Sequence, residues 1–167
     1  KGIKNDKFFF PKEIIKSKFL VKSKLNYAEN LLSKNDDSKA VTFISENGFR
    51  EEKSWKELNN NTLKFINFLK ENKIKEKDRI AAYTVNQIET VEGFLATSAI
   101  GAIWSSCSPD FGTQGVIERF SQIKPKLLII TDRYYYNGKE INIIERLPAI
   151  LKKIKSIKSV LIINYPG

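Results

Sequence analysis

The sequence predicts an α/β fold in which a mostly parallel sheet carries helices on both faces. From Arg79 onward, short apolar runs alternate with stretches whose apolar residues recur at helical spacing. This alternation is typical of right-handed strand–helix–strand units. The chain has 167 residues, 41% of them hydrophobic, which is enough to bury the core of one ordinary domain. We therefore expect a single domain or part of one.

The first part of the chain, residues 1–38, is predicted to be a lead-in segment to an α/β part over 39–167. It is basic and contains an aromatic run at 8–10, which we expect to lie on the body of the domain. A short helix is predicted over 26–32. Its inward-facing residues are expected to be Tyr27, Ala28 and Leu31.

A hairpin and a long helix are predicted next. The runs at 40–45 and 49–53 flank Asn47-Gly48, a dipeptide typical of tight hairpin turns. Ser54 and Glu57 then have the spacing of a capping box, in which each side chain bonds the other residue's amide. We expect Asn72 to end the helix in a left-handed conformation. The apolar stripe of this helix comprises Leu58, Phe65, Ile66 and Leu69.

The strand–helix alternation occupies the rest of the chain. Strands are predicted at 79–85, 102–107, 126–131 and 159–163. A helix is expected to follow Asn86, which with Glu89 repeats the capping pattern, and another is expected over 113–123. Residues 132–140 are interpreted as a polar loop. A last helical pattern passes through Ile141, Ile144 and Leu147, with Pro148 at a first-turn position.

Charge leaves two interpretations open. The net charge is +10, and 24 of the 29 basic residues are lysine, whereas proteins that read nucleic acids rely on arginine for bidentate contacts. The lysines are scattered and are most frequent in runs such as 73–77 and 152–158. They form either an ordinary solvated surface or a field that attracts a polyanion, namely a nucleic acid or a nucleotide cofactor.

Missing residue types exclude several kinds of site. The chain contains no histidine and a single cysteine, Cys107, so it holds no histidine-based catalytic or metal centre and no internal disulfide. Cys107 has no base to activate it and is expected to be a small buried strand residue. No apolar run reaches the length of a membrane span, so we expect a cytoplasmic protein. The ends, Lys1 and Tyr165-Pro166-Gly167, are interpreted as cuts from a larger protein.

Two polar segments follow predicted strands, where open α/β sheets place ligands. Residues 108–112 (SPDFG) precede the helix from Thr113, whose first amides can bind an anion. Residues 132–140 (DRYYYNGKE) offer Arg133, three tyrosines and Lys139, a set that suits a purine with an attached phosphate. If their strands are neighbours, the two segments face each other across a crevice. An exposed polar loop and a packed turn are the alternative.

One stretch resembles a known family. The run GAIWSSCSPDFGTQGVIERFSQIKPKLLIITD (residues 101–132), with YYYNGK after it, is similar to the acetoacetyl-CoA synthetase branch of the adenylate-forming acyl-CoA ligases. LNYAENLL (25–32), SWKEL (54–58) and the Lys77-Asp78-Arg79 turn extend the resemblance along nearly the whole chain. The family often has glycine where Lys77 stands, which suggests that this turn need not be left-handed.

The resemblance implies a ligase that joins acetoacetate to CoA. ATP first converts the acid to an acyl-adenylate, and the CoA thiol then displaces AMP, with Mg²⁺ accompanying the ATP. The expected partners are these small molecules, with no nucleic acid and no membrane, in lipid and ketone-body metabolism. The ATP-site and catalytic residues would lie after Gly167. The chain would be the N-terminal portion of the large AMP-binding domain and inactive alone, although a non-catalytic relative of the same fold stays possible.

The resemblance also implies where CoA binds. Tyr136, Asn137, Gly138 and Lys139 match the family's segment for the CoA nucleotide, with a basic residue at the position of Lys139 near the phosphates. Tyr136 stands where relatives often carry arginine, so stacking is its expected role. A second group matches the loop that walls the CoA adenine: Ser108, Pro109 and Asp110.

Overall fold

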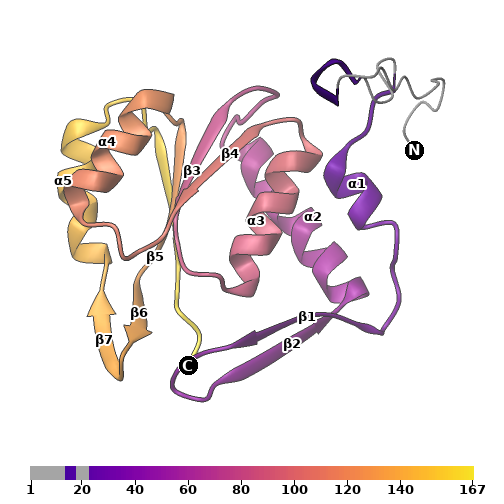
Figure 1. Cartoon of the computed structure of the whole chain (residues 1–167), viewed down its shortest axis with the longest axis horizontal. Helices are drawn as coiled ribbons and strands as arrows, with labels where there is room; N and C mark the ends of the chain where they lie inside the picture. The colour runs from indigo at the N-terminus through magenta and orange to yellow at the C-terminus, as the bar shows by residue number, and fades with distance from the viewer. Residues whose placement is uncertain (1–13, 18–22) are drawn as a thin grey trace.

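The computed structural model describes residues 14–17 and 23–167, and a four-stranded parallel sheet forms its centre (Figure 1). The aromatic run expected at 8–10 lies outside the described residues. The sheet has the strand order β4-β3-β5-β8, and all neighbouring pairs are parallel. The four strands are β3 (Arg79–Tyr83), β4 (Ile103–Cys107), β5 (Leu127–Thr131) and β8 (Ser159–Ile163).

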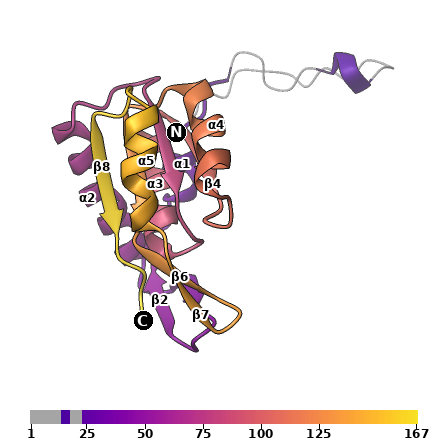
Figure 2. The ribbon, with the colours of Figure 1, turned by 90° about the vertical axis from the view of Figure 1, so that its left-hand side faces the viewer.

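Helices cover both faces of this sheet, as predicted (Figures 1 and 2). On one face, α2 (Trp55–Glu71) and α3 (Ile88–Ala99) pack against side chains such as Ile80 and Ile129. On the other, α4 (Thr113–Ile123) and α5 (Leu147–Lys153) pack against Tyr83 and Ile130. All five residues of β5 are buried, because this strand lies inside the sheet with helices on both sides. Each buried leucine or isoleucine contributes about 1.5–3 kcal/mol to folding.

Two antiparallel hairpins complete the described part of the chain. The first joins β1 (Lys39–Ile44) and β2 (Arg50–Ser54) through the turn at Gly48, where φ is +84°. The second joins β6 (Arg133–Tyr136) and β7 (Lys139–Asn142) directly after β5. Short helical segments are also present: η1 (Ile14–Lys16) and α1 (Tyr27–Leu31) precede β1, and η2 (Ile144–Arg146) lies between β7 and α5.

The starts of α2 and α4 follow the local sequence signals closely. The capping box at Ser54 and Glu57 is present in both directions, and α4 spans the predicted 113–123. Ala28 is buried in α1 as expected, but Tyr27 is 55% exposed and lies with its ring 5.5 Å from that of Phe94. The prediction that Tyr27 faces inward was therefore wrong, because its ring, tilted by 56° to that of Phe94 in α3, leaves more than half of the residue exposed.

Three boundary predictions were also wrong. Asn72 keeps a right-handed φ of −78°, and the left-handed residue after α2 is Lys73. Helix α3 begins after Gln87 rather than Asn86, and no side chain caps it. Residues 132–140 form most of a hairpin rather than a loop, and residue 141 lies in β7 rather than in a helix. The Asn137-Gly138 dipeptide explains this difference, since both residues have positive φ, as a tight hairpin turn requires.

The turn before β3 is left-handed at Lys77, although this residue is not glycine. Lys77 has a φ of +67°, and its amide donates to the carbonyl of Gly101 at 2.9 Å. The expectation that this turn need not be left-handed was wrong. The fixed path between α2 and β3 imposes the conformation, and the lysine carries a backbone cost that glycine would avoid.

Candidate functional site

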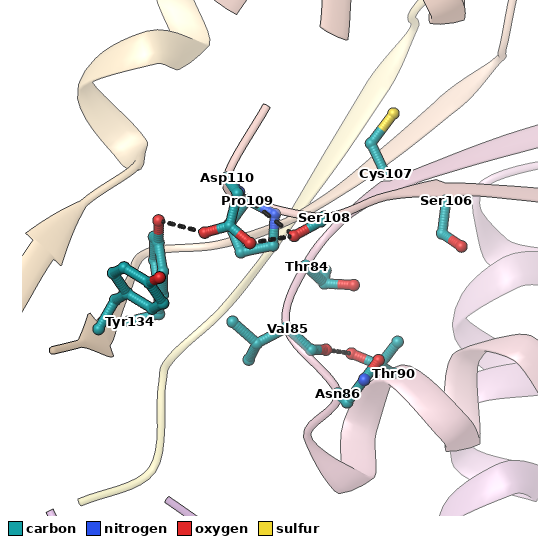
Figure 3. A pocket seen from close by; sticks show the side chains of 11 residues that line it. Thr84, Val85, Asn86, Thr90, Ser106, Cys107, Ser108, Pro109, Asp110 and Tyr134 are labelled. Carbon is teal, nitrogen blue, oxygen red and sulfur yellow. Dashed lines mark hydrogen bonds between the residues drawn. The ribbon is translucent and has the colours of Figure 1, made fainter. Parts of the chain in front are cut away.

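A cavity of about 310 Å³ opens where β3, β4 and β5 end (Figure 3). The chain leaves β3 toward α3 on one face of the sheet and leaves β5 toward α5 on the other, so this is the point where the direction of winding changes. Open α/β sheets bind ligands at such points. The lining residues are Thr84, Val85, Asn86, Thr90, Ser106, Cys107, Ser108, Pro109, Asp110, Tyr134 and Tyr136.

The two polar segments predicted from the sequence meet at this cavity. The hydroxyl of Tyr134 donates to Asp110 Oδ1 at 2.9 Å, and that of Ser108 donates to Asp110 Oδ2 at 2.8 Å. Their parent strands β4 and β5 are not neighbours, because β3 lies between them. The crevice therefore forms across β3, and the residues that follow β3 make its floor.

The environment of Tyr134 favours its neutral form. The side chain is only 7% exposed, and burial together with the bonded carboxylate of Asp110 raises the pKa of Tyr134 to about 12. Two hydroxyl groups thus donate to the Asp110 carboxylate. Because Tyr134 is neutral at physiological pH, its hydrogen bond links the 108–112 loop to the second hairpin.

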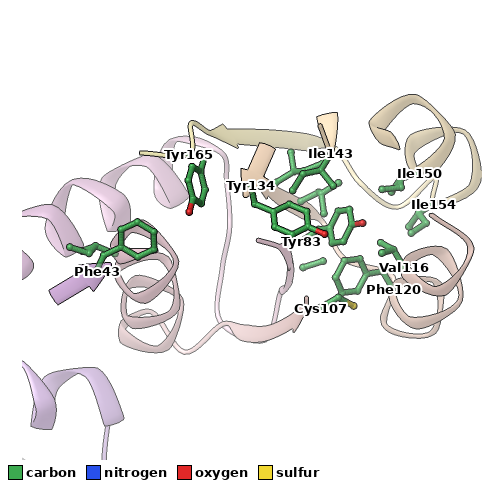
Figure 4. Packing of buried hydrophobic residues seen from close by; sticks show 14 residues of the cluster. Phe43, Tyr83, Cys107, Val116, Phe120, Tyr134, Ile143, Ile150, Ile154 and Tyr165 are labelled. Atoms are coloured by element: carbon green, nitrogen blue, oxygen red, sulfur yellow. The ribbon is translucent and has the colours of Figure 1, made fainter. Parts of the chain in front are cut away.

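Beneath the loop lies a support that the sequence did not reveal. Tyr83, at the end of β3, is fully buried within the core cluster shown in Figure 4. Its hydroxyl lies 2.6 Å from the carbonyl oxygen of Phe111 and 3.0 Å from that of Pro109. Arg146 donates to the same two carbonyls and to the hydroxyl of Tyr83. Burial raises the pKa of Tyr83, partly opposed by the bond and charge of Arg146.

The second hairpin separates its tyrosines by strand alternation. Tyr134 points toward Asp110, whereas the ring of Tyr135 lies 5.8 Å from that of Tyr165 and its hydroxyl donates to Glu140. Tyr136 lines the cavity and is 59% exposed, so an aromatic face stays open to a ligand. The three consecutive tyrosines therefore have three different surroundings.

Lys139 lies directly opposite Tyr136 in the hairpin register. Cross-strand partners place their side chains on the same face, so an ammonium group and an exposed aromatic ring occupy one side of the hairpin. Among the described residues, no carboxylate pairs with Lys139. Asn137 and Gly138 form the turn between them, with the Gly138 amide 3.5 Å from Glu46 Oε2. Neither these two residues nor Lys139 lines the cavity, so Tyr136 alone of this predicted group does.

Other groups considered from the sequence are paired with neighbouring charges, lie outside the cavity or, like Cys107 in the cavity wall, are buried. Arg133 pairs with Asp132 at 2.9 Å and with Glu140 at 3.4 Å. Helix α4 begins after Gly112 without a side-chain cap, but its first residue, Thr113, does not line the cavity. Cys107 is 6% exposed, and burial raises the pKa of its thiol, as suits a packing residue.

The described part of the chain contains neither a metal-binding cluster nor a membrane-spanning helix. Within residues 14–17 and 23–167, no group of three or more histidine, cysteine, aspartate or glutamate side chains is placed to hold a metal ion. Over the same residues, no helix has both the length and the apolar character needed to cross a membrane.

Comparison with known proteins agrees with this architecture. The AMP-binding enzyme family matches residues 29–167. An acetoacetyl-CoA synthetase of Gallus gallus is 41% identical over 145 residues, which are 86% of this chain and 22% of that protein. An acetoacetyl-coenzyme A synthetase of Rhizobium meliloti is 40% identical over 154 residues, 92% of this chain and 23% of that protein.

A solved structure gives the same result in three dimensions. The acetoacetyl-CoA synthetase from Streptomyces lividans superposes with a TM-score of 0.83 at 29% identity, over 89% of this chain and 23% of that one. This chain thus spans less than a quarter of the length of these relatives. The match over residues 29–167 shows that the chain belongs to the AMP-binding enzyme family.

Proposed function

We propose that this chain is part of an ATP-dependent acid–thiol ligase that makes acetoacetyl-CoA from acetoacetate, ATP and CoA. The observation that carries the proposal is the similarity to acetoacetyl-CoA synthetases over 86–92% of the chain. Because the chain spans 22–23% of those relatives, the activity belongs to a longer protein, and we expect the 167 residues alone to be inactive. Residues 1–167 would then be the N-terminal portion of the large AMP-binding domain, in a cytoplasmic enzyme of lipid and ketone-body metabolism.

The chemistry of this ligase activates a carboxylate. A carboxylate oxygen of acetoacetate attacks the α-phosphorus of ATP, and the bond to pyrophosphate breaks. The CoA thiolate then attacks the acyl carbon, and AMP leaves with the electron pair of the broken bond. AMP is a good leaving group where a free carboxylate oxygen is not, which is why the first step is needed.

Within this enzyme, we assign the cavity at the ends of β3, β4 and β5 to the nucleotide portion of CoA. The exposed ring of Tyr136 suits stacking on adenine, and Lys139 on the same face suits a phosphate. Asn137 and Gly138 supply the turn that brings these two side chains together. The opposite wall consists of Ser108, Pro109 and Asp110, where the hydroxyls of Ser108 and Tyr134 satisfy the Asp110 carboxylate.

The described residues do not fit a site for the Mg²⁺ that accompanies ATP in this family. Residues 14–17 and 23–167 contain no cluster of three possible ligands. We therefore expect the ATP site, together with its metal, in the remainder of the enzyme.

The activity is tested on the full-length protein that contains this sequence. Purified enzyme with acetoacetate, ATP and CoA is expected to release AMP and pyrophosphate and to form the thioester, and acetate in place of acetoacetate should react more slowly. The isolated 167-residue chain should show no turnover. Absence of acetoacetate-dependent pyrophosphate exchange in the full-length protein would refute the proposal.

The CoA assignment is tested by Lys139→Ala in the full-length enzyme. Loss of a charge-assisted contact costs about 1.5–3 kcal/mol, so the KM for CoA should rise roughly 10- to 150-fold. Pyrophosphate exchange, which reports adenylation alone, should stay within about twofold of wild type. Lys70→Ala, at an exposed lysine of α2, is the matched control and should change neither quantity. An equal loss of exchange and thioester formation would contradict the assignment.

A further inference from the structure

We propose that Arg146, together with Tyr83, is a positioning residue that fixes the shape of the 108–112 loop at the CoA cavity. Only the identity of the ligand rests on the function proposed above. The clamp itself is described by contacts within this chain, so it can be tested with or without CoA.

The clamp consists of one guanidinium nitrogen and one phenol that share two carbonyl acceptors. Arg146 Nη1 lies 3.0 Å from the carbonyl oxygen of Pro109 and 3.1 Å from that of Phe111. It also donates to the hydroxyl of Tyr83, which lies 2.6 Å from the Phe111 oxygen. Arg146 comes from η2 and Tyr83 from the end of β3, so two separate elements converge on one loop.

Holding these carbonyls also sets the direction of the amides. In a trans peptide the C=O and N–H bonds point in opposite directions, and the described chain has no cis peptide. The amide of Asp110, which shares its peptide with the Pro109 carbonyl, accordingly faces away from Arg146 and toward Ser108 Oγ at 3.3 Å. Loss of the clamp would free two carbonyl oxygens to turn outward, where they repel an anionic ligand.

Arg146 acts through the loop rather than by touching the ligand. It does not line the cavity, whereas Pro109 and Asp110 do. A loop held in its binding conformation before the ligand arrives avoids the entropic cost of ordering it during binding. The expected consequence is tighter CoA binding without any change in the chemistry of adenylation.

The kinetic test uses Arg146→Met and Arg146→Lys in the full-length enzyme, with Arg79→Met as the control. Arg79 is an exposed arginine at the opposite end of β3. Arg146→Met should raise the KM for CoA roughly tenfold, as expected for a lost charged hydrogen bond, with kcat and pyrophosphate exchange within about twofold of wild type. Arg146→Lys keeps one charged donor and should recover part of the effect, and Arg79→Met should have none.

Tyr83→Phe provides a second arm of the kinetic test. If Tyr83 and Arg146 hold the same carbonyls, the double variant should have a KM for CoA no higher than about twice that of the worse single variant, because interacting residues are not additive. Multiplicative effects of the two substitutions would overturn the shared clamp.

Hydrogen exchange on the full-length enzyme separates the clamp from its ligand. Without CoA, Arg146→Met should speed exchange of the loop amides, those of Ser108 and residues 110–112, at least fivefold, and Arg79→Met should leave it unchanged. Unchanged exchange in Arg146→Met would overturn the clamp whatever the ligand is. Faster exchange with an unaltered KM for CoA, while Lys139→Ala still raises that KM, would overturn the positioning role and leave the proposed function standing. If Lys139→Ala also leaves the KM unaltered, the CoA assignment itself has failed.

Discussion

The bond between Tyr134 and Asp110 joins the two halves of the candidate site and allows a quantitative prediction. Tyr134 is 7% exposed, and its hydroxyl donates to the carboxylate of Asp110 at 2.9 Å. Tyr134→Phe removes this hydroxyl. A hydrogen bond to a charged group contributes about 1.5–3 kcal/mol, and we take the lower end because Asp110 is itself exposed. The free energy of unfolding should therefore fall by about 1.5 kcal/mol at pH 7.

The same substitution should change the dependence of stability on pH. The folded-state pKa of Tyr134 is about 12, above the usual value of 10, so the stabilisation is complete below pH 10 and is lost as pH rises from 10 to 12. A two-unit shift corresponds to at most about 2.7 kcal/mol, and solvent screening near the cavity reduces it to about 2 kcal/mol. Between pH 10 and pH 12, the free energy of unfolding should fall by about 2 kcal/mol more in wild type than in Tyr134→Phe.

Urea unfolding of the 167-residue chain, followed by the fluorescence of Trp55 and Trp104, measures both effects. Asp110→Asn should lower stability by about 1 kcal/mol, since a neutral amide oxygen still accepts a weaker bond. The double variant should be more stable than the sum of the single losses predicts, by about 1 kcal/mol. Additive single effects, or parallel pH profiles for wild type and Tyr134→Phe, would refute the interpretation of this contact.

Two further predictions concern the frame around the site. Lys77→Gly should raise the free energy of unfolding by about 0.5–1 kcal/mol, because glycine adopts the φ of +67° without the steric cost of a side chain; a lower thermal midpoint than wild type would contradict this. Cys107 should react with a thiol reagent at least 100-fold more slowly in the folded chain than in urea, because burial raises its pKa and blocks access; equal rates would show that it is not a packing residue.

The sequence predicted the sheet better than it predicted the site. Continuous apolar runs such as 127–131 and the capping box at Ser54 are local signals, and the structure confirms both. The strand order is not local, so the sequence could not show that β3 separates the two polar segments. The hairpin at 133–142 was missed although Asn137-Gly138 is a recognised turn signal, because three consecutive tyrosines and flanking charges conceal the strand alternation.

Sequence patterns could not predict the contact between Tyr83 and Arg146 beneath the site, for a related reason. Tyr83 ends a buried strand and Arg146 stands within a short helical segment, 63 residues later in the chain. Neither position carries a motif, and their roles depend on packing that brings β3 and η2 to the same loop. The scattered lysines, by contrast, did not decide between a nucleic acid and a nucleotide cofactor as the polyanion partner. Membership of the AMP-binding enzyme family favours the nucleotide cofactor.

A crystal structure of the full-length enzyme with CoA bound tests the central claim most directly. We expect density for the adenine against the ring of Tyr136, a CoA phosphate within about 3 Å of Lys139 Nζ, and the 108–110 segment along the opposite side of the nucleotide. A CoA nucleotide bound away from the cavity at the ends of β3, β4 and β5 would contradict it.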